Sequence, residues 1–489
     1  MKPKSTKNIK AIIAGAGKAG ELLSKNIFNS DDAPFEVVGF VDDDESKQGL
    51  SINGLKIIGR FKDIPKIVEE LSVDEVIIAL PSVRGDVIRK IVDNHANRRI
   101  KYRILPRINE VLAQPFEDDY LKYLRRVVAV DLVGDEIKKI DQEEIKKIVK
   151  PQTIMITGAA GSIGSELSRQ IALYGAQRVI FYDWWENGMF ELRNQIIENY
   201  SEARFEFIIG DIKDKKKLNY IIKKYQPDTI FHAAAYKHVP LMEANPSEAI
   251  KNNIIGTKIV GEAAIRNNVK KFVLVSSDKA VNPTNVMGAT KRGAEKIIHI
   301  LAESQSETIF CAVRFGNVAN SNGSVMPLFE RQIEKGGPLT VTHKNVTRYF
   351  MTIPEAVHLI LKAWIMGENN DLFVLDMGEP IKIYDLARWI IAINGYIPET
   401  DIKIEVVGLR PGEKLYEELL VNEESTSSTV VEGIFKTKNY LSFDRLKFLN
   451  NLTYIEESLE SEDFDGNDIK NHLKLMISTY HPSLNEISN

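Results

Sequence analysis

Two glycine turns of the same kind constrain this chain more than any other feature of its sequence. Each lies between an apolar strand and an amphipathic helix: the first stretch reads "KAIIAGAGKAGELLSKNI" and the second reads "TIMITGAAGSIGSELSRQI". A repeated order of strand, glycine turn and helix is typical of α/β proteins with parallel sheets. We therefore expect an α/β chain with two parallel sheets.

Each turn has the spacing of a dinucleotide-binding loop. Glycines let the backbone turn tightly and approach a pyrophosphate, which lies against the N-terminal end of the following helix. A carboxylate at the end of the next strand can accept hydrogen bonds from an adenosine ribose, which favours NAD. Asp42 and Asp183 occupy these positions. The pattern predicts two Rossmann-like doubly wound parallel-sheet domains, the second with a smaller C-terminal substrate-binding subdomain.

The two loops differ in the spacing of their glycines. The first has the form Gly-x-Gly-x-x-Gly of many dinucleotide folds, and the second has the form Gly-x-x-Gly-x-x-Gly of short-chain dehydrogenases. We therefore place a bound NAD in the second domain. For the first loop, the favoured interpretation is a scaffold that binds another nucleotide or no ligand. The glycines concerned are Gly15, Gly17 and Gly20 in the first loop and Gly158, Gly161 and Gly164 in the second.

Composition shifts along the chain predict four parts. Residues 1–133 form the N-terminal Rossmann-like domain, and the charged stretch 134–152 is a linker that ends near a proline. Residues 153–425 form the catalytic domain with its substrate subdomain. Residues 426–489 are rich first in Ser and Thr and then in acidic residues, which predicts a loop followed by a helical tail.

The composition excludes several classes of partner. The 489 residues carry a net charge of −4, so neither nucleic acid nor an anionic membrane is expected to bind. The sequence has no apolar run near the roughly 18 residues of a membrane span and no metal-ligand spacing among its histidines. The single cysteine, Cys311, lies in an apolar run and indicates a reducing compartment. We expect a cytoplasmic protein without a metal, either free in the cytoplasm or at the inner face of the membrane.

One stretch, "SSDKAVNPTNVMGATKR", follows the apolar run "KFVLV" where a short-chain dehydrogenase has its Tyr-x-x-x-Lys pair. Here the pair is Met287-x-x-x-Lys291. A thioether cannot take a proton from an alcohol, so the site is either inactive or moves its protons through other groups. Ser277, Asp278 and Lys279, just before this pair, are the candidates for that chemistry.

From about residue 153 to 420 the chain resembles the extended short-chain dehydrogenase family, and within it the nucleotide-sugar 4,6-dehydratases of polysaccharide and glycan biosynthesis. The phrases that carry the resemblance are "TGAAGSIGSEL", "HAAAYKHVPLMEANPSEAIKNNIIGT", "SSDKAVNPTNVMGATKR", "RFGNVANSNGSVMPLF", "GGPLTVTHKNVTRYFMTIPEA" and "GLRPGEKLYEEL". The first 130 residues resemble the domain that precedes the catalytic one in long UDP-N-acetylglucosamine 4,6-dehydratases, where Met also replaces Tyr. Long members usually begin with membrane-spanning helices, so this chain is expected to be a soluble variant or a shortened form.

The resemblance implies oxidation of the sugar at C4, loss of water across C5 and C6, and reduction at C6, with NAD retained and the C5 configuration kept. It implies that Asp278 is the acid for the C6 hydroxyl and Lys279 the base for C5. Lys291 would hold the nicotinamide ribose. Ser277 would hydrogen-bond the C4 hydroxyl. As a hypothesis, Asp278 has a second task, which is to take the proton of that hydroxyl. We expect Lys291 and the nicotinamide charge to lower the pKa of Lys279 toward neutrality, and Met287 to pack.

The remaining site residues follow from the same resemblance, in which arginine matches the geometry of a diphosphate. The substrate is expected to be a UDP-sugar and the protein a homo-oligomer. Substrate contacts are expected at Lys237, Asn317, Arg348, Arg410 and Glu413. Cofactor contacts are expected at Gly158, Gly161, Ser162, Ile163, Gly164, Asp183, Asp211, Ile212, Ala233, Ala234 and Lys291.

Two other functions stay open. A nucleotide-sugar 4-epimerase would need the tyrosine or a substitute, and it has no use for an Asp-Lys pair. A non-catalytic NAD-binding sensor or scaffold would fit Met287, but it would not need the diphosphate arginines. Which N-acetylhexosamine is used also stays open.

Overall fold

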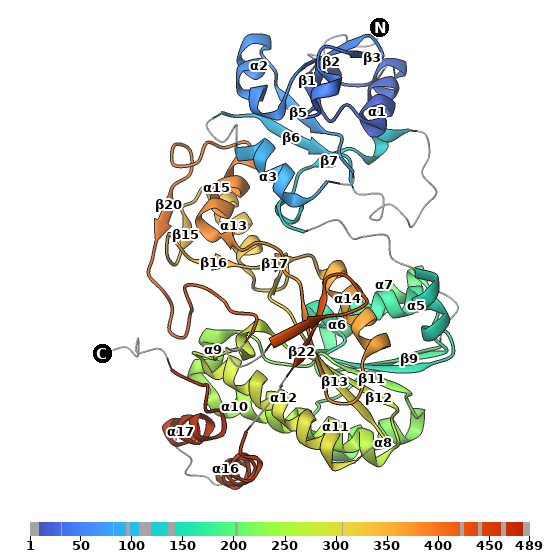
Figure 1. Ribbon diagram of the computed structural model, residues 1–489, viewed down its shortest axis with the longest axis vertical. Helices are drawn as coiled ribbons and strands as arrows, with labels where there is room; N and C mark the ends of the chain where they lie inside the picture. The colour runs from blue at the N-terminus through green and yellow to red at the C-terminus, as the bar shows by residue number, and fades with distance from the viewer. Residues whose placement is uncertain are drawn as a thin grey trace. The chain divides into compact units, whose positions relative to one another are not determined.

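The chain folds into two units, and each contains its own large sheet (Figure 1). Unit 1 comprises Met1–Lys138, Ser324–Asn345 and Ile381–Val407, and unit 2 comprises Lys139–Gly323, Val346–Pro380 and Gly408–Asn489. The computed structural model describes residues 9–30, 32–81, 83–93, 98–106, 119–134, 142–200, 204–305, 307–420, 425–438, 443–460 and 466–482. Residues 135–141 of the predicted linker therefore lie outside the described residues.

The described part of unit 1 forms a seven-stranded sheet in the order β3-β4-β2-β1-β5-β6-β7. The five inner strands run parallel, and the two edge strands pair antiparallel with their neighbours. The strands are β1 Ile9–Ala14, β2 Phe35–Val41, β3 Ser51–Ile52, β4 Leu55–Gly59, β5 Glu75–Ile78, β6 Lys101–Ile104 and β7 Arg125–Arg126. The helices packed with them are α1 Lys18–Asn29, α2 Ile64–Leu71 and α3 Gly85–Asp93.

Two later segments of the chain belong to unit 1 as well. They contain α13 (Val325–Glu334), β15 (Leu339–Val341), α15 (Ile383–Ile393) and β20 (Ile404–Val406). The Arg99 guanidinium donates two hydrogen bonds to Asp401, at 2.6 and 3.1 Å, and the Trp389 indole donates to Asp93 at 3.0 Å. The predicted division at 133 and 153 did not anticipate this grouping, because these contacts join residues about 300 positions apart in the sequence.

The sheet of unit 2 has nine strands among the described residues, in the order β10-β9-β8-β11-β12-β13-β18-β22-β21. The first seven are parallel, and the last two pair antiparallel. Central strands such as "TIMIT" and "KFVLV" are apolar without alternation, which is typical of parallel strands that are buried on both faces. The strands are β8 Thr153–Thr157, β9 Arg178–Asp183, β10 Arg204–Ile209, β11 Thr229–His232, β12 Lys271–Val275, β13 Ile309–Arg314, β18 Asp371–Leu375, β21 Ser425–Ser428 and β22 Ile434–Lys438.

Helices cover both faces of this sheet, so unit 2 has one apolar core on each side (Figure 1). This arrangement confirms the predicted α/β class with parallel sheets. One core takes residues from α5 Gln142–Val149, α6 Ser162–Leu173, α7 Glu186–Asn199 and α14 Ile353–Met366. The other takes residues from α8 Lys215–Tyr225, α11 Gly256–Arg266 and α12 Val286–Ser304.

The C-terminal segment differs from the prediction. A loop was expected after residue 425, yet β21 and β22 form there and extend the sheet beyond β18. Small polar residues do not prevent a strand when a neighbouring strand supplies its backbone hydrogen bonds. The two helices beyond them, α16 (Arg445–Ser458) and α17 (Gly466–Met476), agree with the predicted helical tail.

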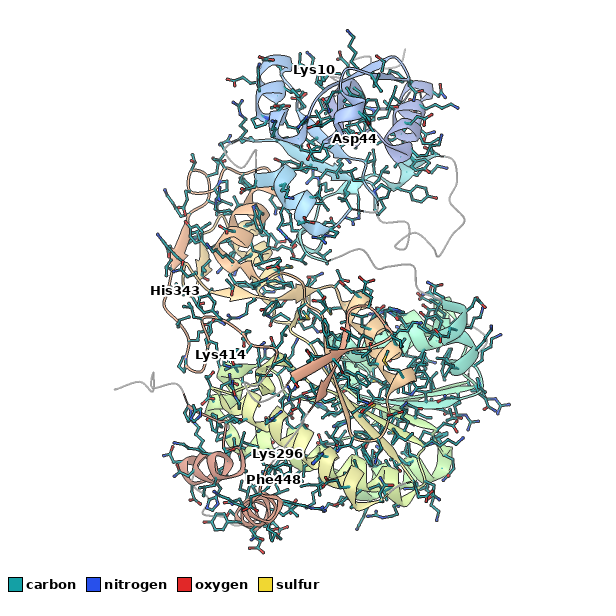
Figure 2. The ribbon with its side chains drawn as sticks, in the orientation of Figure 1. Lys10, Asp44, Lys296, His343, Lys414 and Phe448 are labelled. Atoms are coloured by element: carbon teal, nitrogen blue, oxygen red, sulfur yellow. The ribbon has the colours of Figure 1, made fainter. Side chains whose placement is uncertain are left out.

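The two C-terminal helices pack on α12 rather than extending into solvent. Phe448 and Leu473 are buried in an apolar cluster that also includes Met287 of α12. The ammonium of Lys296, also in α12, donates to the carbonyl oxygen of Met476 at 2.9 Å and lies 5.6 Å from the ring centre of Phe448 (Figure 2). Across the described ranges, no helix has the length and apolar character needed to span a membrane.

Candidate active site

The glycine loop of unit 2 follows β8 and is tightly packed at its base. Gly158 has a φ of +70°, and a Cβ there would lie 2.6 Å from the backbone nitrogen of Ala234, just after β11. A Cβ on Gly164 would overlap the carbonyl oxygen of Gly158. Both positions therefore require glycine. Gly161 is the N-cap of α6, so the first turn of that helix begins at the loop, the arrangement that binds a pyrophosphate.

Asp183 ends β9 and faces this loop. Its two carboxylate oxygens accept hydrogen bonds from the backbone N–H groups of Ala160 and Trp185, both at 3.0 Å. The residue is 7% exposed, and burial raises the pKa of its carboxyl group although the backbone hydrogen bonds oppose the rise. The position suits the predicted contact with an adenosine ribose.

Asp42 in unit 1 has similar surroundings with one difference. It accepts from the backbone N–H groups of Ala16, at 2.7 Å, and Asp44, at 2.9 Å. In addition, the ammonium of Lys47 lies 3.1 Å from the same carboxylate. The first loop therefore has its acidic residue already paired with a cation, which distinguishes it from the second loop.

The other predicted cofactor residues lie around the second loop. Asp211 accepts from the Lys213 backbone N–H at 2.8 Å and pairs with the Lys213 ammonium at 3.0 Å, so it is already engaged. The Ser162 hydroxyl accepts from the backbone of Asn322 at 3.2 Å. Ile212 is buried, and Ile163, Ala233 and Ala234 are half-buried at the ends of the elements that border the loop.

Ser277, Asp278 and Lys279 form a short turn directly after β12. The Ser277 hydroxyl donates to Asp278 Oδ1 at 2.9 Å, and the Lys279 ammonium donates to the same oxygen at 3.1 Å. Lys279 also donates to Asn317 Oδ1 at 3.0 Å, from the segment after β13. Four residues predicted from two separate motifs are thus brought into one hydrogen-bonded group, because β12 and β13 are parallel neighbours.

The second carboxylate oxygen of Asp278 is the notable atom of this group. Asp278 is 1% exposed, and its Oδ2 has no hydrogen-bond partner among the described residues. A Cβ on Gly316 would lie 3.3 Å from that oxygen. A buried, unpaired carboxylate oxygen is costly unless a ligand pairs with it. Oδ2 is therefore a buried acceptor that has no partner among the described residues.

The structure adds a residue that the sequence reasoning did not assign, Glu417. Its Oε1 lies 3.7 Å from the Lys279 ammonium and 3.5 Å from Nε of Arg348, and its side chain is 5% exposed. Arg348 also pairs with Glu413 at 3.1 Å. Glu417 lies in the phrase "GLRPGEKLYEEL", which already pointed to the substrate site. The sequence alone does not show whether Glu417 or the adjacent Glu418 faces that site.

The charges around Lys279 contradict one expectation. Burial would lower the pKa of Lys279, but the carboxylates of Asp278 and Glu417 outweigh it and raise that pKa above its usual value. The predicted fall toward neutrality was therefore wrong for the chain without ligands. Burial also raises the pKa of Asp278, and Glu417 adds to the rise while Lys279 opposes it. Asp278 is thus suited to hold and release a proton.

Lys291 and Met287 lie in α12 but face different surroundings. The Lys291 ammonium donates to the carbonyl oxygen of Val275 at 2.7 Å, which places it beside the end of β12. Burial lowers the pKa of Lys291 to about 8, while Glu295 opposes the fall. Met287 is 3% exposed and lies in the apolar cluster beneath α16 and α17. The structure thus gives Met287 a packing environment.

The loop that carries Arg410 and Glu413 is anchored on the segment that follows Lys279. The side chains of Thr284 and Asn285 both donate to the carbonyl oxygen of Gly412 at 3.0 Å, and Lys414, labelled in Figure 2, donates to the carbonyl of Val281 at 3.0 Å. Glu413 accepts from the backbone of Arg410 at 3.1 Å. The guanidinium-bearing residue Arg410 is itself exposed.

Two basic residues lie at the end of β11 or shortly after it. Lys237 is exposed, and its pKa is lowered by desolvation first and by the charge of Lys279 second. His232 is buried between the hydroxyl groups of Thr157 and Thr257, at 2.7 and 3.0 Å. Burial lowers the pKa of His232 to about 3, so it is neutral. No group of three His, Cys, Asp or Glu side chains suited to a metal ion occurs among the residues that the structure describes.

Comparison with known proteins identifies relatives for both parts of the chain. Residues 154–439 match the family described as polysaccharide biosynthesis protein, and residues 4–106 match the family described as CoA-binding domain. The chain is similar to the probable polysaccharide biosynthesis protein EpsC of Bacillus subtilis, with 45% identity over 425 residues that cover 87% of this chain and 70% of the relative. It is also similar to the capsular polysaccharide biosynthesis protein CapD of Staphylococcus aureus, with 45% identity over 433 residues that cover 87% and 71%.

Solved structures that resemble more than half of the chain include one with substantial sequence identity. The X-ray structure of Pen from Bacillus thuringiensis is 36% identical, with a TM-score of 0.55. The match covers 59% of this chain and 88% of Pen.

Proposed function

The chain belongs to the polysaccharide biosynthesis protein family, and on that basis we propose that it is an NAD-dependent nucleotide-sugar 4,6-dehydratase. The proposed substrate is UDP-N-acetylglucosamine, and the product is the UDP-4-keto-6-deoxy sugar with its C5 configuration retained. The sugar would then feed polysaccharide or glycan biosynthesis.

The observation that carries the proposal is the Asp278–Lys279 pair with its free carboxylate oxygen. Lys279 and Ser277 both donate to Oδ1, whereas Oδ2 has no partner among the described residues. We assign Oδ2 to the substrate. Elimination of water needs one group that protonates a leaving hydroxyl and another that removes a C–H proton. A 4-epimerase moves no proton at C5 or C6, so it would have no use for this pair.

Proton movement is assigned to this chain's residues as follows. Asp278 Oδ2 accepts the proton from the C4 hydroxyl, which Ser277 orients, and later returns a proton to the departing C6 oxygen. The raised pKa of Asp278, which burial causes, supports a carboxyl group that carries a proton between two steps. Lys279 first loses its own proton to solvent, which requires that the substrate weaken the attraction of the two carboxylates for its ammonium. The neutral amine then removes the C5 proton and returns it to C5 when C6 is reduced.

The residues around the second glycine loop fit NAD. Gly158 and Gly164 pack too closely for any side chain, α6 begins at the loop, and the buried Asp183 carboxylate faces it. When bound, NAD would supply reversible hydride acceptance at C4 and donation to C6. Lys291, beside the end of β12, would hold the nicotinamide ribose and place positive charge near the reacting alcohol.

The diphosphate is assigned to Arg348 and Arg410, and the uridine ribose to Glu413. Arg348 is paired with two carboxylates in the chain without ligands, so it must exchange at least one of them for phosphate oxygens. Arg410 is exposed on a loop that is anchored next to the Asp278 turn. Lys237 and Asn317 remain assigned to the sugar.

The test is to incubate the purified protein with UDP-N-acetylglucosamine and to measure the mass of the nucleotide sugar. The proposal predicts loss of one water, without added cofactor, because the NAD is restored in each turnover and has no need to leave. A product of unchanged mass but altered C4 configuration would favour the 4-epimerase. An unchanged substrate, with dinucleotide bound to the protein, would favour the non-catalytic sensor.

A further inference from the structure

Glu417 lies between two cations of the candidate site that have separate expected tasks. Its Oε1 is 3.7 Å from the ammonium of Lys279 and 3.5 Å from Nε of Arg348. Lys279 comes from the turn after β12, and Arg348 comes from β16 (Thr347–Arg348). One carboxylate oxygen is therefore shared by the proposed C5 base and by the arginine that we assign to the diphosphate.

The pairing is buried, which makes the charge of Glu417 matter. The side chains of Glu417, Arg348 and Lys279 are 5, 10 and 19% exposed. Electrostatic interactions are less screened in such surroundings than at the surface. Burial would raise the pKa of Glu417, but Lys279 and Arg348 outweigh it and lower that pKa, so the carboxylate is ionised at neutral pH.

We infer that Glu417 is a positioning residue that links the two halves of the site, holding the Lys279 ammonium in place and competing with the substrate diphosphate for Arg348. The inference rests on the proposed function for the task of Lys279, but the placement of Glu417 does not depend on it. Glu417 acts through Lys279 and Arg348, the two side chains that it contacts.

The first consequence concerns affinity for the substrate. Arg348 is held by Glu417 and by Glu413 until phosphate oxygens replace one of them. Substitution of Glu417 by glutamine removes one of the two carboxylate charges that compete with the diphosphate for Arg348. Arg348 is then freer to bind the diphosphate, so the KM for the nucleotide sugar should fall severalfold.

The second consequence concerns the protonation of Lys279. The charged groups that face its ammonium are Asp278, Glu417, Arg348 and Lys237. The two carboxylates favour the protonated form, and the two cations disfavour it. Loss of the Glu417 charge leaves one carboxylate against two cations, so Lys279 should release its proton at lower pH.

The experiment uses the full chain with the variants Glu417→Gln and Glu417→Asp. The adjacent Glu418→Gln is the matched control, because the Glu418 side chain is 47% exposed and pairs with Lys414 rather than with Lys279. Reaction of Lys279 with acetic anhydride across a pH series, followed by peptide mass spectrometry, reports the protonation of the amine without any substrate. The midpoint for Lys279 should fall by about one pH unit in Glu417→Gln, by less in Glu417→Asp, and not at all in Glu418→Gln.

The pH dependence of kcat for the nucleotide sugar is the second readout. Its acidic limb should move to lower pH in Glu417→Gln by the same amount, while KM falls. A side chain with a merely structural role would lower kcat at every pH and leave the labelling midpoint where it is. That result, or an equal shift in Glu418→Gln, would overturn the inference. If the wild type removes no water from the sugar but the labelling midpoint still shifts, the proposed function fails and the role of Glu417 stands.

Discussion

Arg314 and Glu295 form a fully buried ion pair beneath the carboxyl ends of β12 and β13. The Arg314 Nε and Nη2 atoms donate to the two oxygens of Glu295, both at 2.8 Å, and neither side chain is exposed. The Ser276 hydroxyl, one residue before the Ser277 turn, donates to Glu295 at 2.6 Å. Burial would raise the pKa of Glu295, but the arginines Arg314 and Arg292 outweigh it and lower that pKa to about 2. This pair fixes α12 to the two strands that carry the site.

Glu295→Gln should therefore destabilise the protein strongly, because it leaves the Arg314 charge buried without its carboxylate. We expect a loss of about 3–5 kcal/mol in the free energy of unfolding, measured by urea denaturation at neutral pH. Glu21→Gln is the control, since Glu21 pairs with Lys18 at the surface and such pairs contribute about 0–1 kcal/mol. Equal losses in the two variants would show that the buried pair adds nothing beyond a surface pair.

Asp278→Asn and Lys279→Met should stop the reaction at different steps. Asparagine keeps the shape of Asp278 but cannot accept the C4 proton, so we expect neither reduced nicotinamide absorbance nor water loss on mixing with the sugar. Lys279→Met leaves the first oxidation possible, so reduced nicotinamide absorbance should build up without loss of water. Rapid mixing followed by absorbance measures both. If Asp278→Asn still reduces the bound cofactor, the proton from O4 leaves by another route, and the double role of Asp278 is wrong.

Asp183→Ala should lower the amount of dinucleotide that copurifies with the protein, whereas Asp42→Ala should leave it unchanged. Both carboxylates accept backbone hydrogen bonds from their own glycine loops, so the variants remove similar contacts. Only the Asp183 change is expected to remove a partner of the adenosine ribose. Denaturation of each protein and chromatography of the released dinucleotide measure the difference. The reverse result would place the cofactor in the first loop.

Met287→Ala should reduce stability but not chemistry. Met287 is 3% exposed in an apolar cluster with α16 and α17, so its truncation should cost about 2–5 kcal/mol in the free energy of unfolding. The kcat of the folded fraction should stay near the wild-type value, because no proton passes through a thioether. Urea denaturation and active-site titration separate the two effects. A loss of kcat at full folding would give Met287 a role near the reacting atoms.

Much of this architecture was predictable from local pattern. The two glycine loops and the apolar strands before them fixed the α/β class and the parallel sheets, and the motifs were enough to indicate the family that the comparisons confirm. The position of Asp278 and Lys279 at a strand end could be read from the sequence, whereas Asn317 came from the resemblance, and the tasks of all three stay predictions. The predicted homo-oligomer and the association with a membrane surface stay predictions.

Other features depend on contacts that sequence pattern does not encode. The raised pKa of Lys279 comes first from its neighbour Asp278 and then from Glu417, which lies about 140 residues away in the sequence. Strand β22 pairs with the edge of β18, and the small polar residues of β21 form a strand because β22 in turn offers them an edge. The grouping of 324–345 and 381–407 with the N-terminal unit likewise rests on long-range pairs such as Arg99 with Asp401. The pKa, the two strands and the grouping of the segments all depend on residues that are distant in the sequence.

The central claim is that the sugar is oxidised at C4 and reduced at C6 within one turnover, with the same cofactor molecule. The direct measurement is to supply UDP-N-acetylglucosamine that carries deuterium at C4 and to locate the label in the product by NMR. The account predicts a product that has lost one water and carries the deuterium at C6. A product that keeps the deuterium at C4 and has not lost water would contradict it, and so would a dehydrated product whose label has exchanged into solvent.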